Sequence, residues 1–184
     1  MKLIGKAWKF GDNISTDLIA PGRYYHLRSN LPELAKHVLE DADPEFASEM
    51  SKGDFVVGGR NFGMGSSREH APVIIKLAGV NAVIAKKFAR IFFRNAINVG
   101  LPAIECDTDK IAQGDELEVD LSSGKIINRT QGTEISFKPL PPVMTAILRD
   151  GGLAAHIAKH GDFRLQALEK LEQRVLGTSV PREG

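Results

Sequence analysis

The pattern of apolar positions predicts an α/β arrangement for the first two thirds of the chain. Short apolar or loosely alternating runs, bounded by glycine, proline and polar residues, have the length and composition of strands. We expect these strands at 3–10, 55–57, 83–85 and 101–106. Apolar residues spaced by three and four positions predict helices around and between them, at 31–40, 71–80 and 88–99, with a short helical or turn segment at 43–50.

The last third of the chain begins with a different pattern. Three alternating runs predict an antiparallel meander with one solvent-exposed face, at 116–121, 125–129 and 133–137. Helix-like patterns follow, with a charged tail after them, at 143–150, 153–159 and 163–176. Because the chain has no internal repeat and no linker long enough to separate two domains, we expect one compact, layered domain over 1–184. Its helical C-terminal extension would cover about 163–184.

The helix expected at 88–99 has two different faces. Its apolar face carries a stripe that is typical of a core contact and not of a ligand-binding motif: Phe88, Phe92, Ala96 and Val99. Its polar face either lies in solvent or contacts a partner subunit: Lys87, Arg90, Arg94 and Asn98. The sequence alone leaves these two possibilities open.

Polar chemistry is concentrated where the strand at 55–57 ends. Four glycines lie within 58–65, and Ser66, Ser67 and Arg68 follow them. Glycine permits positive φ and close approach of the backbone, and a helix N-terminus offers free N–H groups and a partial positive charge to an anion. We therefore expect an acidic small molecule to bind at these three side chains.

The same residues also allow a purely structural interpretation. Ser66 and Glu69 have the spacing of a capping box, which stabilises a helix N-terminus. Pro72 constrains both interpretations, because a proline beyond the first turn removes a hydrogen bond and crowds the preceding turn. The helix therefore either begins after Ser66 or has an irregular first turn. Nucleotide motifs fit poorly, since Arg68 replaces the third glycine of a dinucleotide fingerprint and the chain contains no Gly-Lys-Ser or Gly-Lys-Thr.

Composition narrows the classes of function. The 24 Lys and Arg residues balance 23 Asp and Glu residues, so neither nucleic acid nor a membrane surface is an expected partner. Cys106 is the single cysteine, so the chain can form no internal disulfide and cannot supply the three or four cysteine ligands of an iron-sulfur cluster. We interpret Cys106 as a buried structural residue. The five histidines are dispersed, and we expect no metal site. No signal peptide or apolar run of ~20 residues is present, which predicts a cytoplasmic protein.

Two longer stretches, 61–72 and 85–102, carry a resemblance to a known family. In sequence and order they resemble the small subunit of 3-isopropylmalate dehydratase, a family that includes homoaconitase small subunits and corresponds to the swivelling domain of aconitase. The resemblance runs from about Gly11 to Cys106, and Met64 departs from the cysteine of many relatives. It implies an α/β fold of the compact, layered β/β/α swivelling type, as in the aconitase C-terminal domain.

The resemblance also implies a reaction and a partner. The reaction interconverts 2-isopropylmalate and 3-isopropylmalate by dehydration and rehydration, in leucine biosynthesis. A separate large subunit would carry a four-iron-four-sulfur cluster, so this chain would bind no cofactor and would be inactive alone. By position in the motif, Ser67 matches the catalytic base, Arg68 a carboxylate-binding arginine and Ser66 a supporting hydrogen-bond group.

Two further segments belong to the implied site. The segment 11–23 is rich in side chains that hydrogen-bond to their own backbone, which favours a shaped loop, although an ordinary turn has the same composition. The resemblance implies that Thr16 and Asp17 lie close to the active site. A carboxylate such as Asp17 can orient an arginine or a histidine of the partner through a charge-assisted hydrogen bond, which is a supporting role without direct substrate contact. The resemblance also implies that Arg28 lies in the segment that selects the variable group of the substrate, although an exposed loop of this composition is often only a surface.

Arg28 leaves the substrate open. A guanidinium binds an additional carboxylate bidentately but has no partner in an isopropyl group. Isopropylmalate is therefore the first expectation, and homoaconitase or a broad isomerase that uses citramalate-type acids is the alternative. A different class of function, a non-catalytic anion-binding regulatory module, also fits the motifs.

Overall fold

The computed structural model describes residues 1–161, and the predicted helix at 163–176 and extension at 163–184 lie outside them. A seven-stranded sheet has the order β4-β3-β2-β1-β5-β6-β7. The strands are β1 (Lys2–Lys9), β2 (Phe55–Val57), β3 (Ala82–Ala85), β4 (Ala103–Glu105), β5 (Glu116–Asp120), β6 (Lys125–Asn128) and β7 (Thr133–Ser136). The helices are α1 (Thr16–Ile19), η1 (Gly22–Leu27), α2 (Leu31–Ala35), α3 (Phe46–Glu49), α4 (His70–Leu77), α5 (Arg90–Val99), η2 (Thr108–Lys110), α6 (Pro142–Arg149) and α7 (Leu153–His160).

Strand β1 joins two different halves of the sheet. Its last residues pair in parallel with β2, Ala7 opposite Phe55, and β3 and β4 continue this parallel half. Its first residues pair antiparallel with β5, Lys2 opposite Asp120, and β6 and β7 continue the meander. The strands β2 and β3 are buried on both faces, whereas buried and exposed positions alternate in β6. Both predicted strand patterns are therefore confirmed.

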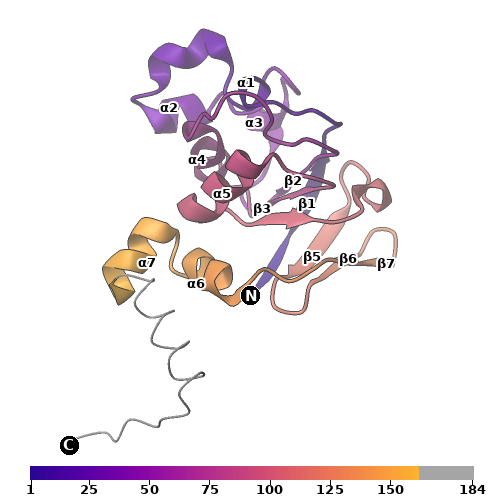
Figure 1. Cartoon of the computed structure of the whole chain (residues 1–184). Coiled ribbons are helices and arrows are strands. Elements are labelled where there is room, and N and C mark those ends of the chain that lie inside the picture. The colour runs from indigo at the N-terminus through magenta and orange to yellow at the C-terminus, as the bar shows by residue number, and fades with distance from the viewer. Residues whose placement is uncertain (162–184) are drawn as a thin grey trace, which may run out of the picture.

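The two faces of the parallel half contact two separate hydrophobic clusters. Val56 and Val83 pack into the cluster formed with the helices, while Phe55, Val57 and Ile84 pack into a cluster with the meander. Figure 1 shows α4 and α5 on one side of these strands and β5–β7 on the other. Helices, parallel strands and curled antiparallel strands thus form three layers, which confirms the predicted β/β/α architecture.

The aromatic stripe of α5 is part of the core, as predicted. Phe92 lies edge-on to Phe62, with ring centroids 5.3 Å apart, and stacks on Phe88 at 6.0 Å. On the opposite face Arg90 and Arg94 are exposed. Each ring contact excludes water from the base of the loop that follows β2, so the position of that loop depends on this cluster.

The helix expected at 31–40 is shorter than predicted, because α2 ends at Ala35. The backbone N–H of Leu39 donates to the carbonyl of Ile19 at 2.9 Å instead of continuing the helix. Leu39 is fully buried and has a φ of +57°, which a helix cannot contain. A tertiary contact therefore overrides the helical pattern here. The helices predicted at 71–80, 88–99, 143–150 and 153–159 are present as α4, α5, α6 and α7.

Within residues 1–161, none of the helices combines the length and the apolar character needed to span a membrane.

Candidate functional site

The loop after β2 is held by contacts that leave room only for glycine at its centre. Gly63 has a φ of +82°, and a Cβ there would lie 2.2 Å from Cγ of Phe92. Its backbone N–H donates to the carbonyl of Ile14 at 2.7 Å. The glycine thus allows this backbone to lie directly on α5 while it pairs with the loop that follows β1.

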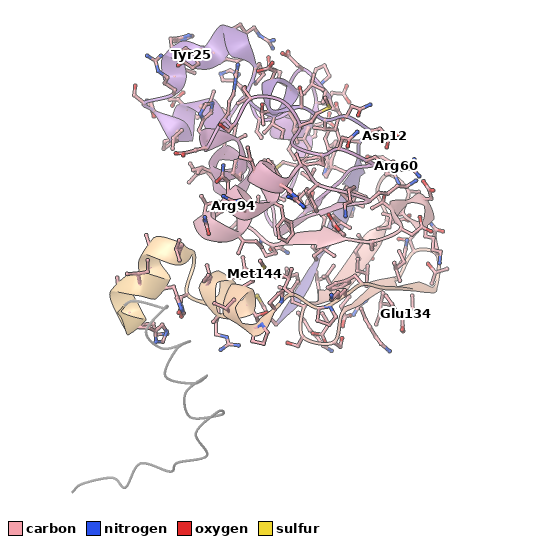
Figure 2. All side chains as sticks on the ribbon, in the orientation of Figure 1. Asp12, Tyr25, Arg60, Arg94, Glu134 and Met144 are labelled. Atoms are coloured by element: carbon pink, nitrogen blue, oxygen red, sulfur yellow. The ribbon has the colours of Figure 1, made fainter. Side chains whose placement is uncertain are left out.

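That second loop has the shaped conformation favoured by its composition. Asp12 Oδ1 accepts from the backbone N–H of Arg60 at 2.7 Å, and Asn61 Nδ2 donates to Asn13 Oδ1 at 3.0 Å. Figure 2 shows Asp12 and Arg60 next to one another where the two loops meet. Loops that are 48 positions apart in sequence therefore form one unit.

This unit brings together most of the predicted site residues. Thr16 is buried, and its Oγ1 donates to the carbonyl of Ser66 at 2.9 Å. Asp17 Oδ1 lies 2.6 Å from Nη2 of Arg68, whose Nη1 donates to the carbonyl of Ala20 at 2.9 Å. The guanidinium is therefore fixed by a carboxylate and a carbonyl from α1 and its C-cap. Asp17 thus contacts an arginine of this chain, whereas the prediction named a group of the partner.

The serines precede α4 and do not belong to it. The helix begins at His70, with Glu69 at the N-cap and no side-chain capping bond, so the capping box does not form. Pro72 is the third residue of the helix, which agrees with the prediction that the helix begins after Ser66. Ser66 and Ser67 therefore lie in irregular backbone before the helix, with both side chains exposed, and the helix N-terminus does not contain them.

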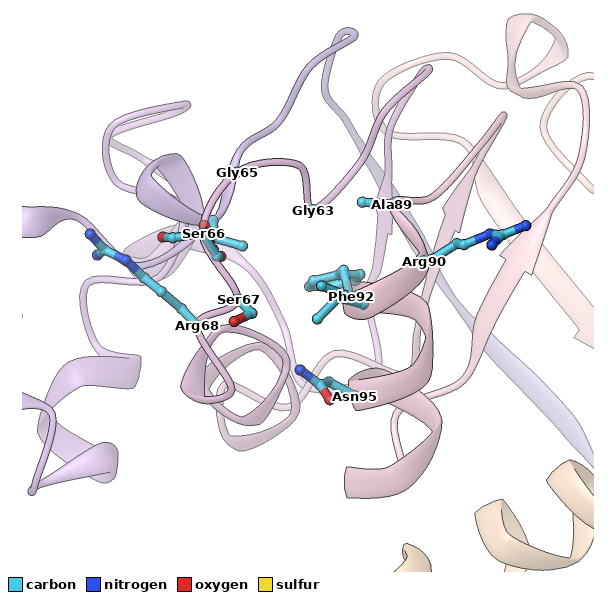
Figure 3. A pocket seen from close by; sticks show the side chains of 11 residues that line it. Gly63, Gly65, Ser66, Ser67, Arg68, Ala89, Arg90, Phe92 and Asn95 are labelled. Atoms are coloured by element: carbon cyan, nitrogen blue, oxygen red, sulfur yellow. Dashed lines mark hydrogen bonds between the residues drawn. The ribbon is translucent and has the colours of Figure 1, made fainter.

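A pocket of about 340 Å³ lies between this segment and α5. Residues 63–68 form one side, with both serines and Arg68, and residues 89–95 form the other. Figure 3 shows the side chain of Asn95 pointing from α5 toward the side that carries Ser67, whereas Arg90 points away. The pocket is open to solvent and is lined by hydroxyl and amide groups, which suit a small polar ligand. Arg68 belongs to its wall, but Figure 3 shows its guanidinium directed away from α5, where it contacts Asp17 and Ala20.

Asn95 is a pocket residue that sequence reasoning missed. It lies three positions after Phe92, on the side of the helix that carries the aromatic stripe. A polar residue that interrupts an apolar helix face was the available signal.

Arg28 is not among the residues that line this pocket. Its side chain is exposed, with the guanidinium 4.2 Å from the centre of the Tyr25 ring and Nη1 donating to the Tyr25 carbonyl at 3.1 Å. In the isolated chain it therefore contacts its own segment. A role in selecting the substrate stays a prediction.

Two titratable groups complete the description of the site and its surroundings. Partial burial and then the charge of Arg68 lower the pKa of His70, which keeps this imidazole neutral at pH 7. Burial raises the pKa of the Cys106 thiol to about 12, with Asp107 adding to the effect. Cys106 is partly buried, and its thiol stays protonated at neutral pH, which fits the interpretation of a structural residue.

The prediction that the histidines are dispersed is wrong. His156 and His160 lie on the same side of α7, and Asp150 joins them, so that one ligand atom from each residue lies within 4.8 Å of the others. The spacing of four between the two histidines is the sequence signal for this pair.

Comparison with known proteins gives consistent results. The family described as Aconitase C-terminal domain matches residues 13–109. A 3-isopropylmalate dehydratase small subunit 2 of Archaeoglobus fulgidus is 67% identical over 165 residues, which cover 90% of this chain and all of that one. A methanogen homoaconitase small subunit of Methanothermobacter thermautotrophicus is 57% identical over 155 residues, covering 84% of this chain and 90% of the relative.

The fold agrees with a solved structure. The crystal structure of 3-isopropylmalate dehydratase from Methanocaldococcus jannaschii superimposes with a TM-score of 0.84 at 42% sequence identity. The match covers 92% of this chain and 99% of that one.

Proposed function

Because the chain belongs to the family of 3-isopropylmalate dehydratase small subunits, which shares the aconitase C-terminal domain, we propose that it is the small subunit of a heteromeric hydro-lyase. The proposed reaction interconverts 2-isopropylmalate and 3-isopropylmalate by dehydration and rehydration. It is a step of leucine biosynthesis, and we expect it to take place in the cytoplasm. The observation that carries the proposal is that Ser66, Ser67 and Arg68 line one pocket of suitable size for a small hydroxy-dicarboxylate.

Ser67 is the proposed base. As an alkoxide it takes the carbon-bound proton during dehydration and returns a proton during rehydration. A serine hydroxyl is a very weak base, so the alkoxide needs nearby positive charge and hydrogen-bond donors. Arg68 is the next residue of the pocket wall and carries a positive charge, and the exposed side chain of Ser67 is accessible to a substrate.

Arg68 is the proposed carboxylate-binding group. Its contacts to Asp17 and Ala20 occupy two of its five N–H donors and fix the plane of the guanidinium. The remaining donors are available for a substrate carboxylate. Thr16 supports the arrangement, because its hydrogen bond to the Ser66 carbonyl holds the backbone next to Ser67.

The large subunit completes the proposed site. When the iron-sulfur cluster is bound there, it supplies the Lewis acid that helps the substrate hydroxyl to leave. We place the cluster on the large subunit because a single cysteine cannot supply its ligands. The pocket is open on this chain, so water would reach the base until the large subunit covers it. Activity therefore requires both chains.

Homoaconitase activity is the second candidate, and a specific residue favours it. Arg28 has a flexible, exposed side chain that could turn from Tyr25 toward a third carboxylate once the large subunit is bound. One of the compared relatives carries the homoaconitase name. More of the compared proteins are named for isopropylmalate, which supports the first candidate.

The experiment that tests the proposal is anaerobic reconstitution with the large subunit encoded beside this chain. Hydration of isopropylmaleate, homoaconitate and citraconate is measured for the wild type and for Arg28→Ala. Preference for isopropylmaleate, unaffected by Arg28→Ala, supports the first candidate. Preference for homoaconitate that Arg28→Ala removes selectively supports the second. A complex that assembles but converts none of the acids overturns both and favours the anion-binding regulatory module.

A further inference from the structure

Two histidines of α7 and an aspartate at the end of α6 form a cluster that shares no residue with the proposed active-site pocket. Asp150 Oδ2 lies 2.7 Å from His156 Nδ1 and 2.9 Å from His160 Nε2. The two histidines are four positions apart, so both rings project from the same side of the helix. One carboxylate oxygen thus faces two imidazole nitrogens.

The backbone fixes the distance between the two helices that carry the cluster. Gly151 and Gly152 reverse the chain with φ values of +89° and +130°. The N–H of Gly152 donates to the carbonyl of Ile147 at 2.9 Å, and a Cβ on Gly152 would lie 2.8 Å from the carbonyl oxygen of Asn98 on α5. The turn is therefore packed tightly against α5, which holds Asp150 in place relative to α7.

The three side chains differ in burial in a way that suits a site with an entrance. The side chains of Asp150 and His156 are 5% and 7% exposed, whereas that of His160 is 35% exposed. Two ligand groups thus lie in the protein, and the third lies at the surface, where an ion can enter. A site buried on all sides would lack this path.

The donor set is that of a transition-metal site. Two imidazole nitrogens and one carboxylate oxygen are ligands that Zn²⁺ accepts, at about 2.0–2.2 Å from the metal. Tetrahedral geometry then separates the ligand atoms by roughly 3.3 Å. The separations of 2.7 and 2.9 Å need to increase by only about half an ångström. The two ring nitrogens lie within 4.8 Å of one another and would have to reach the same spacing, by rotation of the histidine side chains.

Hydrogen bonding alone is the competing explanation of the cluster. Without a metal, each contact between Asp150 and a ring nitrogen contains an N–H proton. Lys159 Nζ also lies 3.0 Å from Asp150 Oδ1 and places a positive charge beside the carboxylate. Such a network would connect α6 and α7 and would bind no ion. Binding of a cation has to displace the ring protons and is opposed by Lys159.

We propose that Asp150, His156 and His160 form a binding site for a divalent transition metal of the Zn²⁺ type. The site goes beyond the proposed hydro-lyase function and requires neither substrate nor large subunit.

The test uses the full, untagged chain after removal of metals. Zn²⁺ binding is measured by calorimetry, and Co²⁺ binding by the visible absorption of its ligand field. One ion per chain is expected. His160→Gln should weaken binding at least tenfold, whereas the matched variant His26→Gln, which removes an exposed histidine elsewhere, should leave binding unchanged. Circular dichroism checks that each variant is folded.

Lys159→Gln separates the two explanations of the cluster. Removal of its charge should strengthen Zn²⁺ binding severalfold if the cluster is a metal site, because the cation no longer meets a neighbouring ammonium group. The proposal is overturned if the wild type binds no ion in a 1:1 ratio. It is equally overturned if His160→Gln and His26→Gln bind zinc with the same affinity, which would indicate adventitious binding only.

Discussion

The carboxylate of Asp17 lies 2.6 Å from the guanidinium of Arg68, across 50 positions of intervening sequence. Asp17 is largely exposed while Arg68 is half-buried in the pocket wall, so the pair orients the arginine more than it stabilises the fold. The relationship makes the loop after β1 part of the proposed active site.

Asp17→Ala should therefore impair catalysis without unfolding the chain. Loss of the carboxylate leaves Arg68 with one fixed contact, and we expect kcat/KM of the reconstituted complex to fall about tenfold. Asp17→Asn keeps an acceptor oxygen and should retain part of the activity. Steady-state kinetics of both variants at equal cluster content is the measurement. Activity equal to the wild type in Asp17→Ala would show that Arg68 needs no positioning.

Ser67→Ala should lower the turnover of every substrate at least about 10³-fold. The reason is that no other hydroxyl takes the position of the proposed base. Assembly with the large subunit should be unchanged, as measured by gel filtration. Ser123→Ala, which removes a hydroxyl from the turn between β5 and β6, is the control and should be fully active. Residual turnover above one tenth in Ser67→Ala would assign the base to another group.

Gly63→Ala should destabilise the protein by at least about 2 kcal/mol, through the positive φ and the contact with Phe92. Gly132→Ala is a matched control, because Gly132 has a φ of +69° but no heavy atom within 4 Å of the position that a Cβ would take. It should lose only about 1 kcal/mol. Urea unfolding of both variants separates the two contributions. Equal losses would mean that the packing of the loop on α5 contributes nothing.

His70 predicts a pH dependence of stability. Its pKa is lowered in the folded chain, by desolvation first and by Arg68 second, relative to the ordinary value of 6.5. The unfolded chain therefore binds a proton more readily, and stability falls as the pH decreases through about 6.5, until the folded state also binds the proton. Urea unfolding at pH 7.5 and pH 5.5 should show a smaller loss for His70→Gln than for the wild type. A larger loss of stability in His70→Gln than in the wild type would contradict the lowered pKa of His70.

The sequence predicted the elements that depend on local pattern and missed those that depend on distant contacts. Strands β2 and β3 followed from short continuous apolar runs, because both of their faces are buried. The aromatic face of α5 followed from its spacing of three and four, because burial repeats with the turn of a helix. The early end of α2 did not, because it depends on the hydrogen bond from Leu39 to Ile19.

The candidate site shows the same division. Motif order indicated Ser66, Ser67 and Arg68, and the structure places them beside one pocket. The second partner of Arg68 is the backbone carbonyl of Ala20. Because every residue has a backbone carbonyl, the sequence cannot indicate this contact. Asn95 lines the pocket because of the way α5 is rotated about its axis, and the sequence does not indicate this rotation.

The double pairing of β1 has a consequence for biosynthesis on the ribosome. Lys2–Lys9 is translated before the other six strands of this sheet, yet one of its two partner strands, Glu116–Asp120, follows more than 100 residues later. Until they emerge, the edge of β1 has unpaired N–H and C=O groups that can bind another nascent chain. Chaperone binding to this strand during translation is the expected protection, and slow codons before residue 116 would prolong the exposure.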